Sequence, residues 1–152
     1  MDKTVVIKDT KEKYGWKFTN MIDRSLKTGD YSLEGYESIF SIERKATAGE
    51  LAGNIISKRF MNELKRGDRL KHFFVLCEFP LEKILTYPRG SGIPPSIWSK
   101  LKVTGHFFLK RIIEIQTAFK VKIIFCRDAE EAQQIAKAIF RRMIELYPDG
   151  DQ

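Results

Sequence analysis

The sequence predicts an α/β fold in which helices cover both faces of a central sheet. Strand and helix patterns follow one another in the order strand, strand, strand, helix, strand, helix, strand, helix, which is typical of a layered arrangement. Two strand patterns, residues 72–79 and 121–126, are nearly all apolar, as expected of central strands buried on both faces. The 152 residues are enough for one domain, 1–152, with its own core.

Three strands are expected in the N-terminal third of the chain. Apolar runs at residues 5–9, 31–34 and 39–45 have the length and composition of strands. Gly35 lies between the second and the third run, where a turn is needed. These three strands therefore form the first part of the predicted sheet.

Helices are expected at five places after the third strand. Thr47 can cap a helix over residues 47–56, with Glu50 at the spacing of a capping box. Asp128 is placed to cap the final helix. The remaining helical patterns cover residues 58–70, 80–87 and 96–119, and a Gly/Pro-rich loop at 89–95 separates the last two.

The composition is that of a folded protein inside the cell. The chain is 43% hydrophobic and has a net charge of +7, which is compatible with a nucleic-acid partner without requiring one. No leader pattern follows Met1, and no apolar run is long enough for a membrane. Cys77 and Cys126 lie in apolar strands and are expected to be free thiols. Only His72 and His106 could serve a histidine-based site.

The most informative stretch runs from Gly29 to Lys45. Asp30 follows a glycine directly, and an apolar run then ends in Glu43, Arg44 and Lys45. Alternation along a strand puts Glu43 and Lys45 on one face and Arg44 on the other. Carboxylates bind hard divalent cations and a lysine can orient a water, so these residues suffice for metal-assisted phosphodiester hydrolysis. The spacing alone also allows a surface hairpin with solvated charges.

The motifs around this stretch resemble the XPF-type (ERCC-type) nuclease domain. That family carries Asp-x-Arg-Glu, then Gly-Asp-Tyr, then Glu-Arg-Lys-x-x-x-Asp, then an Arg-Phe helix. The matching segments here are Asp9-Thr10-Lys11-Glu12, Gly29-Asp30-Tyr31, Glu43-Arg44-Lys45 and Arg59-Phe60. The resemblance covers nearly the whole chain and implies the restriction-endonuclease-like fold, with a central mixed sheet.

Two positions depart from the family pattern. Lys11 replaces the arginine of the first element, and Gly49 occupies the place of the acidic residue after Glu-Arg-Lys. Glu50 lies one place later and has two interpretations. It is either a helix-capping residue or, after a one-residue insertion, the missing carboxylate.

The resemblance implies a Mg²⁺ or Mn²⁺ site. Asp30 and Glu43 are the first choices as metal ligands, with Asp9 and Glu50 as further candidates. Lys45 would orient or deprotonate the attacking water. Asp9 would also count as catalytic if it reaches this cluster, and the alternative for it is a turn residue after the first strand.

Basic residues near these motifs are candidate DNA contacts. Lys11 and Arg44 would either position phosphate or pair with the acidic residues. Arg59 could bind phosphate or pair with Glu63, four residues later on one helix. The remaining candidates on this helix are Lys65, Arg66 and Arg69, for which the alternative is a solvated helix face.

We therefore predict a divalent-metal-dependent DNA endonuclease that acts on branched DNA, such as a flap, fork or bubble, in DNA repair, recombination or phage DNA processing. The alternative is a non-catalytic scaffold with a degenerate nuclease fold. Phe140, Ile144 and Tyr147 make a second apolar stripe in the final helix, which predicts a homodimer or a heterodimer with a related subunit. Leu109 and Ile113 mark the alternative dimer face.

Overall fold

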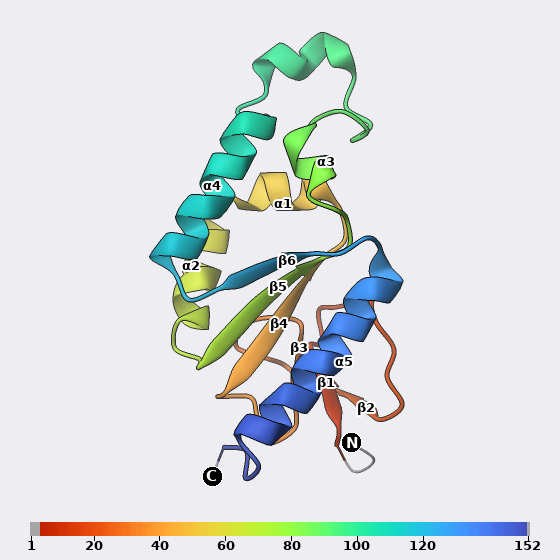
Figure 1. Cartoon of the computed structure of the whole chain (residues 1–152), viewed down its shortest axis with the longest axis vertical. Helices are drawn as coiled ribbons and strands as arrows, with labels where there is room; N and C mark the ends of the chain where they lie inside the picture. Colours follow the sequence, from red (N-terminus) through yellow and green to blue (C-terminus); the bar gives the residue numbers. More distant parts are fainter. Residues whose placement is uncertain (1–3, 152) are drawn as a thin grey trace.

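Six strands form one mixed sheet with helices on both of its faces (Figure 1), in a computed structural model that describes residues 4–151. The strands lie in the order β2-β1-β3-β4-β5-β6. They are β1 (Val6–Lys8), β2 (Met21–Asp23), β3 (Tyr31–Leu33), β4 (Phe40–Lys45), β5 (His72–Cys77) and β6 (Lys122–Phe125). The helices are α1 (Ala48–Asn54), α2 (Lys58–Gly67), α3 (Glu82–Leu85), the 3₁₀ helix η1 (Pro95–Lys100), α4 (Gly105–Ala118) and α5 (Ala129–Leu146). The predicted α/β architecture is confirmed.

The strand β4 lies in the middle of the sheet and carries the predicted catalytic motif. It is antiparallel to β3 and parallel to β5, and β5 is in turn parallel to β6. The helices α1 and α2 make the crossover that a parallel pair requires. The C-terminal end of β4, which carries the motif, therefore lies next to these two helices.

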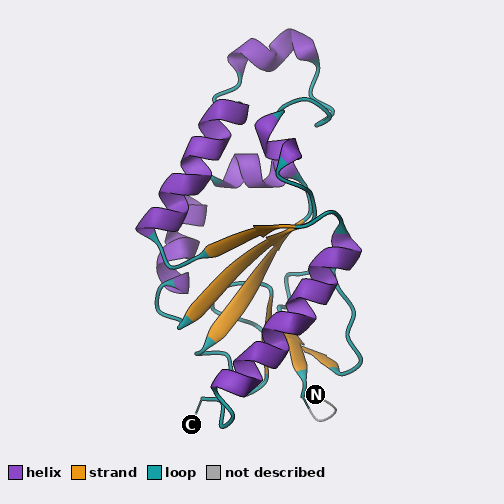
Figure 2. Cartoon of the chain, in the orientation of Figure 1, coloured by secondary structure: helices purple, strands orange, loops and turns teal. Residues whose placement is uncertain are grey.

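Two apolar clusters hold the helices to the sheet. Phe60 and Leu64 of α2 and Phe108 of α4 belong to the cluster on one face. Phe140 of α5 and Phe40 of β4 belong to the cluster on the other face. Figure 2 shows α5 crossing the sheet on the face opposite α2 and α4. Within residues 4–151, no helix has the length and apolarity that a bilayer crossing demands.

Local sequence signals located the helix starts and the main turn correctly. The Thr47 side chain accepts a hydrogen bond from the Glu50 N–H at the start of α1. The Asp128 side chain accepts one from the Glu131 N–H at the start of α5. Gly35, between β3 and β4, has a φ of 86°, which favours glycine.

The C-terminal strand is an edge strand, so its predicted central position is wrong. It is apolar on both sides because Ile123 packs into one cluster and Ile124 packs against the other. The strand β2 was not predicted, because its three residues give no apolar run. Cys77 and Cys126, at the ends of β5 and β6, are buried free thiols as expected.

The long helix expected over residues 96–119 is also wrong, because the chain breaks between η1 and α4. Val103 lies in this break and is buried in the core. Gly105 begins α4 against the end of α3, where an added Cβ would lie 2.1 Å from the Leu85 carbonyl oxygen. A tertiary contact thus ends the pattern that looked continuous in the sequence.

The second apolar stripe of α5 is buried within the chain, which contradicts the basis of the dimer prediction. Phe140 is 0% exposed and lies with its ring centroid 6.0 Å from that of Phe40. Ile144 and Tyr147 are half-buried and pack against the same cluster. The sheet already uses this stripe, whereas Ile113, on the alternative face of α4, is 54% exposed.

Candidate active site

A tight turn before β3 places Asp30 beside β4. Gly29 has a φ of +80°, and an added Cβ there would lie 1.9 Å from the Ser41 Oγ atom. That hydroxyl donates to the Thr28 carbonyl at 2.8 Å, which closes the turn. Asp30 Oδ2 then accepts a hydrogen bond from the Arg44 N–H at 2.7 Å. Glycine is therefore required for the position of the adjacent carboxylate.

The strand β4 carries Glu43 and Lys45 on one face, as predicted. The Lys45 Nζ atom lies 2.9 Å from Glu43 Oε2, and both residues are buried. The same Nζ atom lies 5.5 Å from the centre of the Phe60 ring, which comes from α2. The pair is thus enclosed between the sheet and α2.

Arg44 pairs with acidic residues on the other face of the sheet. Its Nε atom donates to Glu78 Oε2 at 3.0 Å, and its NH1 atom lies 3.4 Å from Glu12 Oε1. The Trp16 indole donates to the same Glu78 oxygen at 2.7 Å. Two roles were expected for Arg44, phosphate contact or pairing with acidic residues, and the structure shows the pairing. The ion pair with Glu12 connects the N-terminal loop to β4.

Glu63 of α2 is a site residue that the sequence analysis did not identify. It lies beside Glu43, and its Oε1 atom is buried without a hydrogen-bond partner among the described residues. The ion pair considered for it with Arg59 is not among those of residues 4–151. An available signal was its place on the buried face of α2, between Phe60 and Leu64.

Asp30, Glu43 and Glu63 line one pocket of about 290 Å³. Four cationic residues also line this pocket: Lys11, Lys27, Arg59 and Arg66. Most of these cations are exposed, whereas the carboxylates are more deeply placed. The pocket can therefore receive a phosphate from solvent and hold it above a cluster of acidic oxygens.

The crowding of these groups perturbs their protonation. Burial and the neighbouring Glu43 carboxylate raise the pKa of Asp30 to about 9. The same two causes raise the pKa of Glu63 to about 7. Burial lowers the pKa of Lys45, but the hydrogen bond to Glu43 and the combined attraction of Glu43, Glu63 and Glu50 outweigh it and raise the pKa above its usual value, so Lys45 is an ammonium.

The donor chemistry of the pocket fits a hard divalent cation. No three His, Cys, Asp or Glu side chains of residues 4–151 converge on one point in this arrangement. However, Mg²⁺ needs only one or two carboxylates and keeps several waters. Asp30 and Glu43 supply two carboxylates, and the unpartnered Glu63 oxygen supplies a further donor. A cation would also relieve the repulsion that raises the two carboxyl pKa values.

Asp9 has the turn role that was its alternative interpretation. Its Oδ1 accepts a hydrogen bond from the Leu26 N–H at 2.8 Å, and its Oδ2 accepts one from the Lys11 N–H at 3.1 Å. These bonds hold the loop that leads to Gly29. Asp9 also lines the carboxylate pocket, so its predicted role as a ligand stays a prediction.

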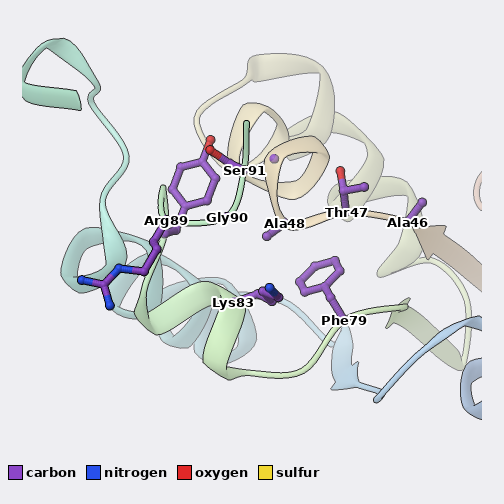
Figure 3. A pocket seen from close by; sticks show the side chains of 10 residues that line it. Ala46, Thr47, Ala48, Phe79, Lys83, Arg89, Gly90 and Ser91 are labelled. Carbon is purple, nitrogen blue, oxygen red and sulfur yellow. The ribbon is translucent and has the colours of Figure 1, made fainter. Parts of the chain in front are cut away.

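Glu50 caps α1, and it does not line the carboxylate pocket. Its side chain is exposed, and Oε1 accepts a hydrogen bond from the Ala46 N–H at 3.3 Å. Gly49, the place of the family's acidic residue, lines a neighbouring pocket of about 280 Å³. Figure 3 shows that pocket between Thr47 and Ala48 on one side and Phe79 and Lys83 on the other.

The predicted DNA contacts fall into three groups. Those that line the carboxylate pocket are Lys11, Arg59 and Arg66. Lys65 on α2 and Arg69, just after the end of α2, are exposed and do not line the pocket. Arg44 is held on the opposite face of the sheet. The first group is therefore best placed to meet a phosphate at the carboxylates.

The ERCC4 domain family model matches residues 7–139. This range includes the four motif segments, which begin at Asp9, Gly29, Glu43 and Arg59. The chain belongs to the ERCC4 domain family. Its fold is similar to that of XPF from Aeropyrum pernix in complex with DNA, with 14% identity, a TM-score of 0.67 and coverage of 94% of this chain and 66% of that chain. A second structure of XPF from Aeropyrum pernix gives 14% identity, a TM-score of 0.64 and coverage of 91% and 61%.

This ERCC4 domain therefore spans just under two thirds of each of those chains. At 14% identity the likeness establishes the fold alone, an α/β arrangement around a mixed sheet that is similar to that of XPF. No curated protein matches the sequence. The assignment of roles to individual residues consequently depends on the geometry described above.

Proposed function

We propose that this ERCC4 domain is a DNA endonuclease that requires Mg²⁺ or Mn²⁺ and cuts branched DNA such as a flap, fork or bubble. The observation that carries the proposal is the ammonium of Lys45 at 2.9 Å from Glu43, a carboxylate that lines one pocket with Asp30. Membership of the family supports the class of reaction. DNA repair, recombination and phage DNA processing are the settings in which such an activity would serve.

Each site residue has a role that follows from its charge and position. Asp30 and Glu43 would hold the cation, which when bound supplies a more acidic water and charge relief on the phosphate. Lys45 has no lone pair to accept a proton while it is an ammonium, so it would orient the attacking water and stabilise developing negative charge. Arg59 and Arg66, which line the same pocket, would bind the phosphate.

The decisive experiment is cleavage of end-labelled DNA by the purified chain. We expect nicking of a fork or flap in Mg²⁺ or Mn²⁺ and none after chelation. Asp30→Asn, Glu43→Gln and Lys45→Ala should each lower the rate by about a hundredfold or more, because each removes a group that acts on the reacting phosphate. Glu145→Gln, an exposed change on α5, is the matched control.

The substrate panel should include single-stranded, duplex, flap, fork and four-way DNA. If the three variants cut like the parent, the site assignment is wrong. If the parent binds the panel tightly but cuts none of it with either metal, the non-catalytic scaffold is the correct function. Equal rates on all five substrates would contradict the preference for branched DNA while leaving the endonuclease intact.

A further inference from the structure

The carboxylate that the family carries after Glu-Arg-Lys is missing from its usual place. Gly49 occupies that position and lines a different pocket. Glu50, the neighbouring acid, is exposed, and its carboxylate accepts the Ala46 N–H at the start of α1. Neither residue lines the pocket that contains Asp30 and Glu43.

We propose that Glu63 replaces this missing carboxylate, so that α2, and not the segment after β4, completes the cation site with Asp30 and Glu43. The inference rests on the proposed function and assigns one more residue to the same site. It also explains why an acidic side chain occupies the buried face of an otherwise basic helix.

The packing of α2 fixes the position of Glu63. Leu64 and Phe60, which lie one and three residues from it along the helix, are both buried in the core. The Ser57 side chain caps the helix by accepting the Phe60 N–H at 3.1 Å. The helix can therefore neither slide nor rotate easily, and the carboxylate is held beside Glu43.

The surroundings of Glu63 leave one of its oxygens without a partner. Oε1 is buried and makes no hydrogen bond among the described residues, which is costly for a carboxylate. Lys45 and Arg66 are the cations whose attraction lowers the pKa of this carboxyl, against burial and Glu43. Lys45 already pairs with Glu43 at 2.9 Å, and the Arg66 Nε atom donates to the Lys27 carbonyl at 3.2 Å. A divalent cation between Glu63 and Glu43 would satisfy the free oxygen.

The alternative is that Glu63 is a protonated carboxylic acid that only packs against Glu43. The two possibilities differ in cation affinity, which can be measured without DNA and without cleavage. Mn²⁺ binding to the full chain, followed by the EPR signal of free Mn²⁺ and by calorimetry, gives this affinity directly. Thermal unfolding with and without Mn²⁺ provides a second measure, since a ligand of the folded state raises Tm.

Five variants make the test specific. We expect Glu63→Gln to weaken Mn²⁺ binding about tenfold or more, and Glu43→Gln to weaken it at least as much. Glu63→Asp keeps the charge and should lose less affinity than Glu63→Gln. Glu50→Gln and the surface control Glu145→Gln should bind Mn²⁺ within twofold of the parent. Each variant should retain a cooperative unfolding transition in EDTA, because the glutamine substitutions preserve side-chain volume.

The outcomes separate this inference from the proposed function. If Glu63→Gln binds Mn²⁺ like the parent while Glu43→Gln binds weakly, the inference is overturned and the proposed function stands. If Glu50→Gln loses affinity and Glu63→Gln does not, Glu50 is the missing carboxylate. If the parent binds no Mn²⁺ in the millimolar range, both the inference and the metal dependence of the proposed function fail.

Discussion

At the scale of single residues, the position of Asp30 depends on the glycine before it. Gly29 has a φ of +80°. An added Cβ there would collide with the Ser41 side chain and would lie 3.3 Å from the Ile42 carbonyl oxygen. The second of these neighbours is backbone of β4, which cannot move without moving Glu43. The Gly-Asp motif is thus a steric requirement for bringing a carboxylate next to a strand.

Comparison of Gly29→Ala with Gly35→Ala tests this requirement. Both glycines have positive φ, 80° and 86°, but an added Cβ at Gly35 would meet nothing within 4 Å. Gly35→Ala should lose only the cost of the strained conformation, about 1–2 kcal/mol in free energy of unfolding. Gly29→Ala should lower the free energy of unfolding by clearly more than this and should also lower the cleavage rate. Urea unfolding measures both variants, and equal losses would contradict the steric argument.

At the scale of elements, α2 supplies two different components of the site. Its buried face carries Glu63 between two core anchors, and its more open side carries Arg59 and Arg66 into the same pocket. Lys65 lies on the exposed part of the helix, and Arg69 is exposed just after its C-terminal end. One helix therefore combines acidic and basic groups, and its register determines how both are presented.

Neutralising the pocket-lining arginines should weaken DNA binding on all sequences about equally. For Arg59→Ala with Arg66→Ala, the slope of log affinity against log salt should fall by about two, because two phosphates would no longer be neutralised. Lys65→Ala with Arg69→Ala is the charge-matched comparison and should have a smaller effect. Fluorescence anisotropy on forks of different sequence in chelator measures binding alone. A salt slope unchanged by the first pair would place the DNA elsewhere.

At the scale of the whole molecule, helices cover both faces of the sheet. Phe140 and its neighbours on α5 cover one face, and α2 with α4 covers the other. The apolar groups that remain exposed on α4 include Phe107, at 39%, and Ile113, at 54%. Because Phe140 is buried within the chain, we expect a homodimer to use the alternative face of α4 and not the stripe on α5.

Two substitutions distinguish core from interface. Phe140→Glu buries a charge in the core and should cost several kcal/mol, enough to unfold the chain. Ile113→Glu should leave Tm of the monomer nearly unchanged and should shift a dimer towards monomer. Circular dichroism and sedimentation measure the two effects. If Phe140→Glu folds and becomes monomeric, the dimer interface lies on α5. If the parent is monomeric at high micromolar concentration, it forms no homodimer, and only a heterodimer with a related subunit stays possible.

The features that depend on neighbouring residues could be predicted from the sequence. Alternation along one strand put Glu43 and Lys45 together, and short-range capping signals placed Thr47 and Asp128 at helix starts. The motif order predicted the fold and the carboxylates of the site. All of these depend on spacing within a few residues or on a pattern shared with a family.

The features that depend on distant contacts could not be predicted from the sequence and are seen in the folded chain. The break before α4 exists because Gly105 meets Leu85, and α5 buries Phe140 because the sheet offers it a second face. Glu63 lies beside Glu43 although twenty positions separate them in the chain. The residue pattern of a helix predicts which side chains share a face. Which residues that face contacts depends on how the helix packs on the sheet.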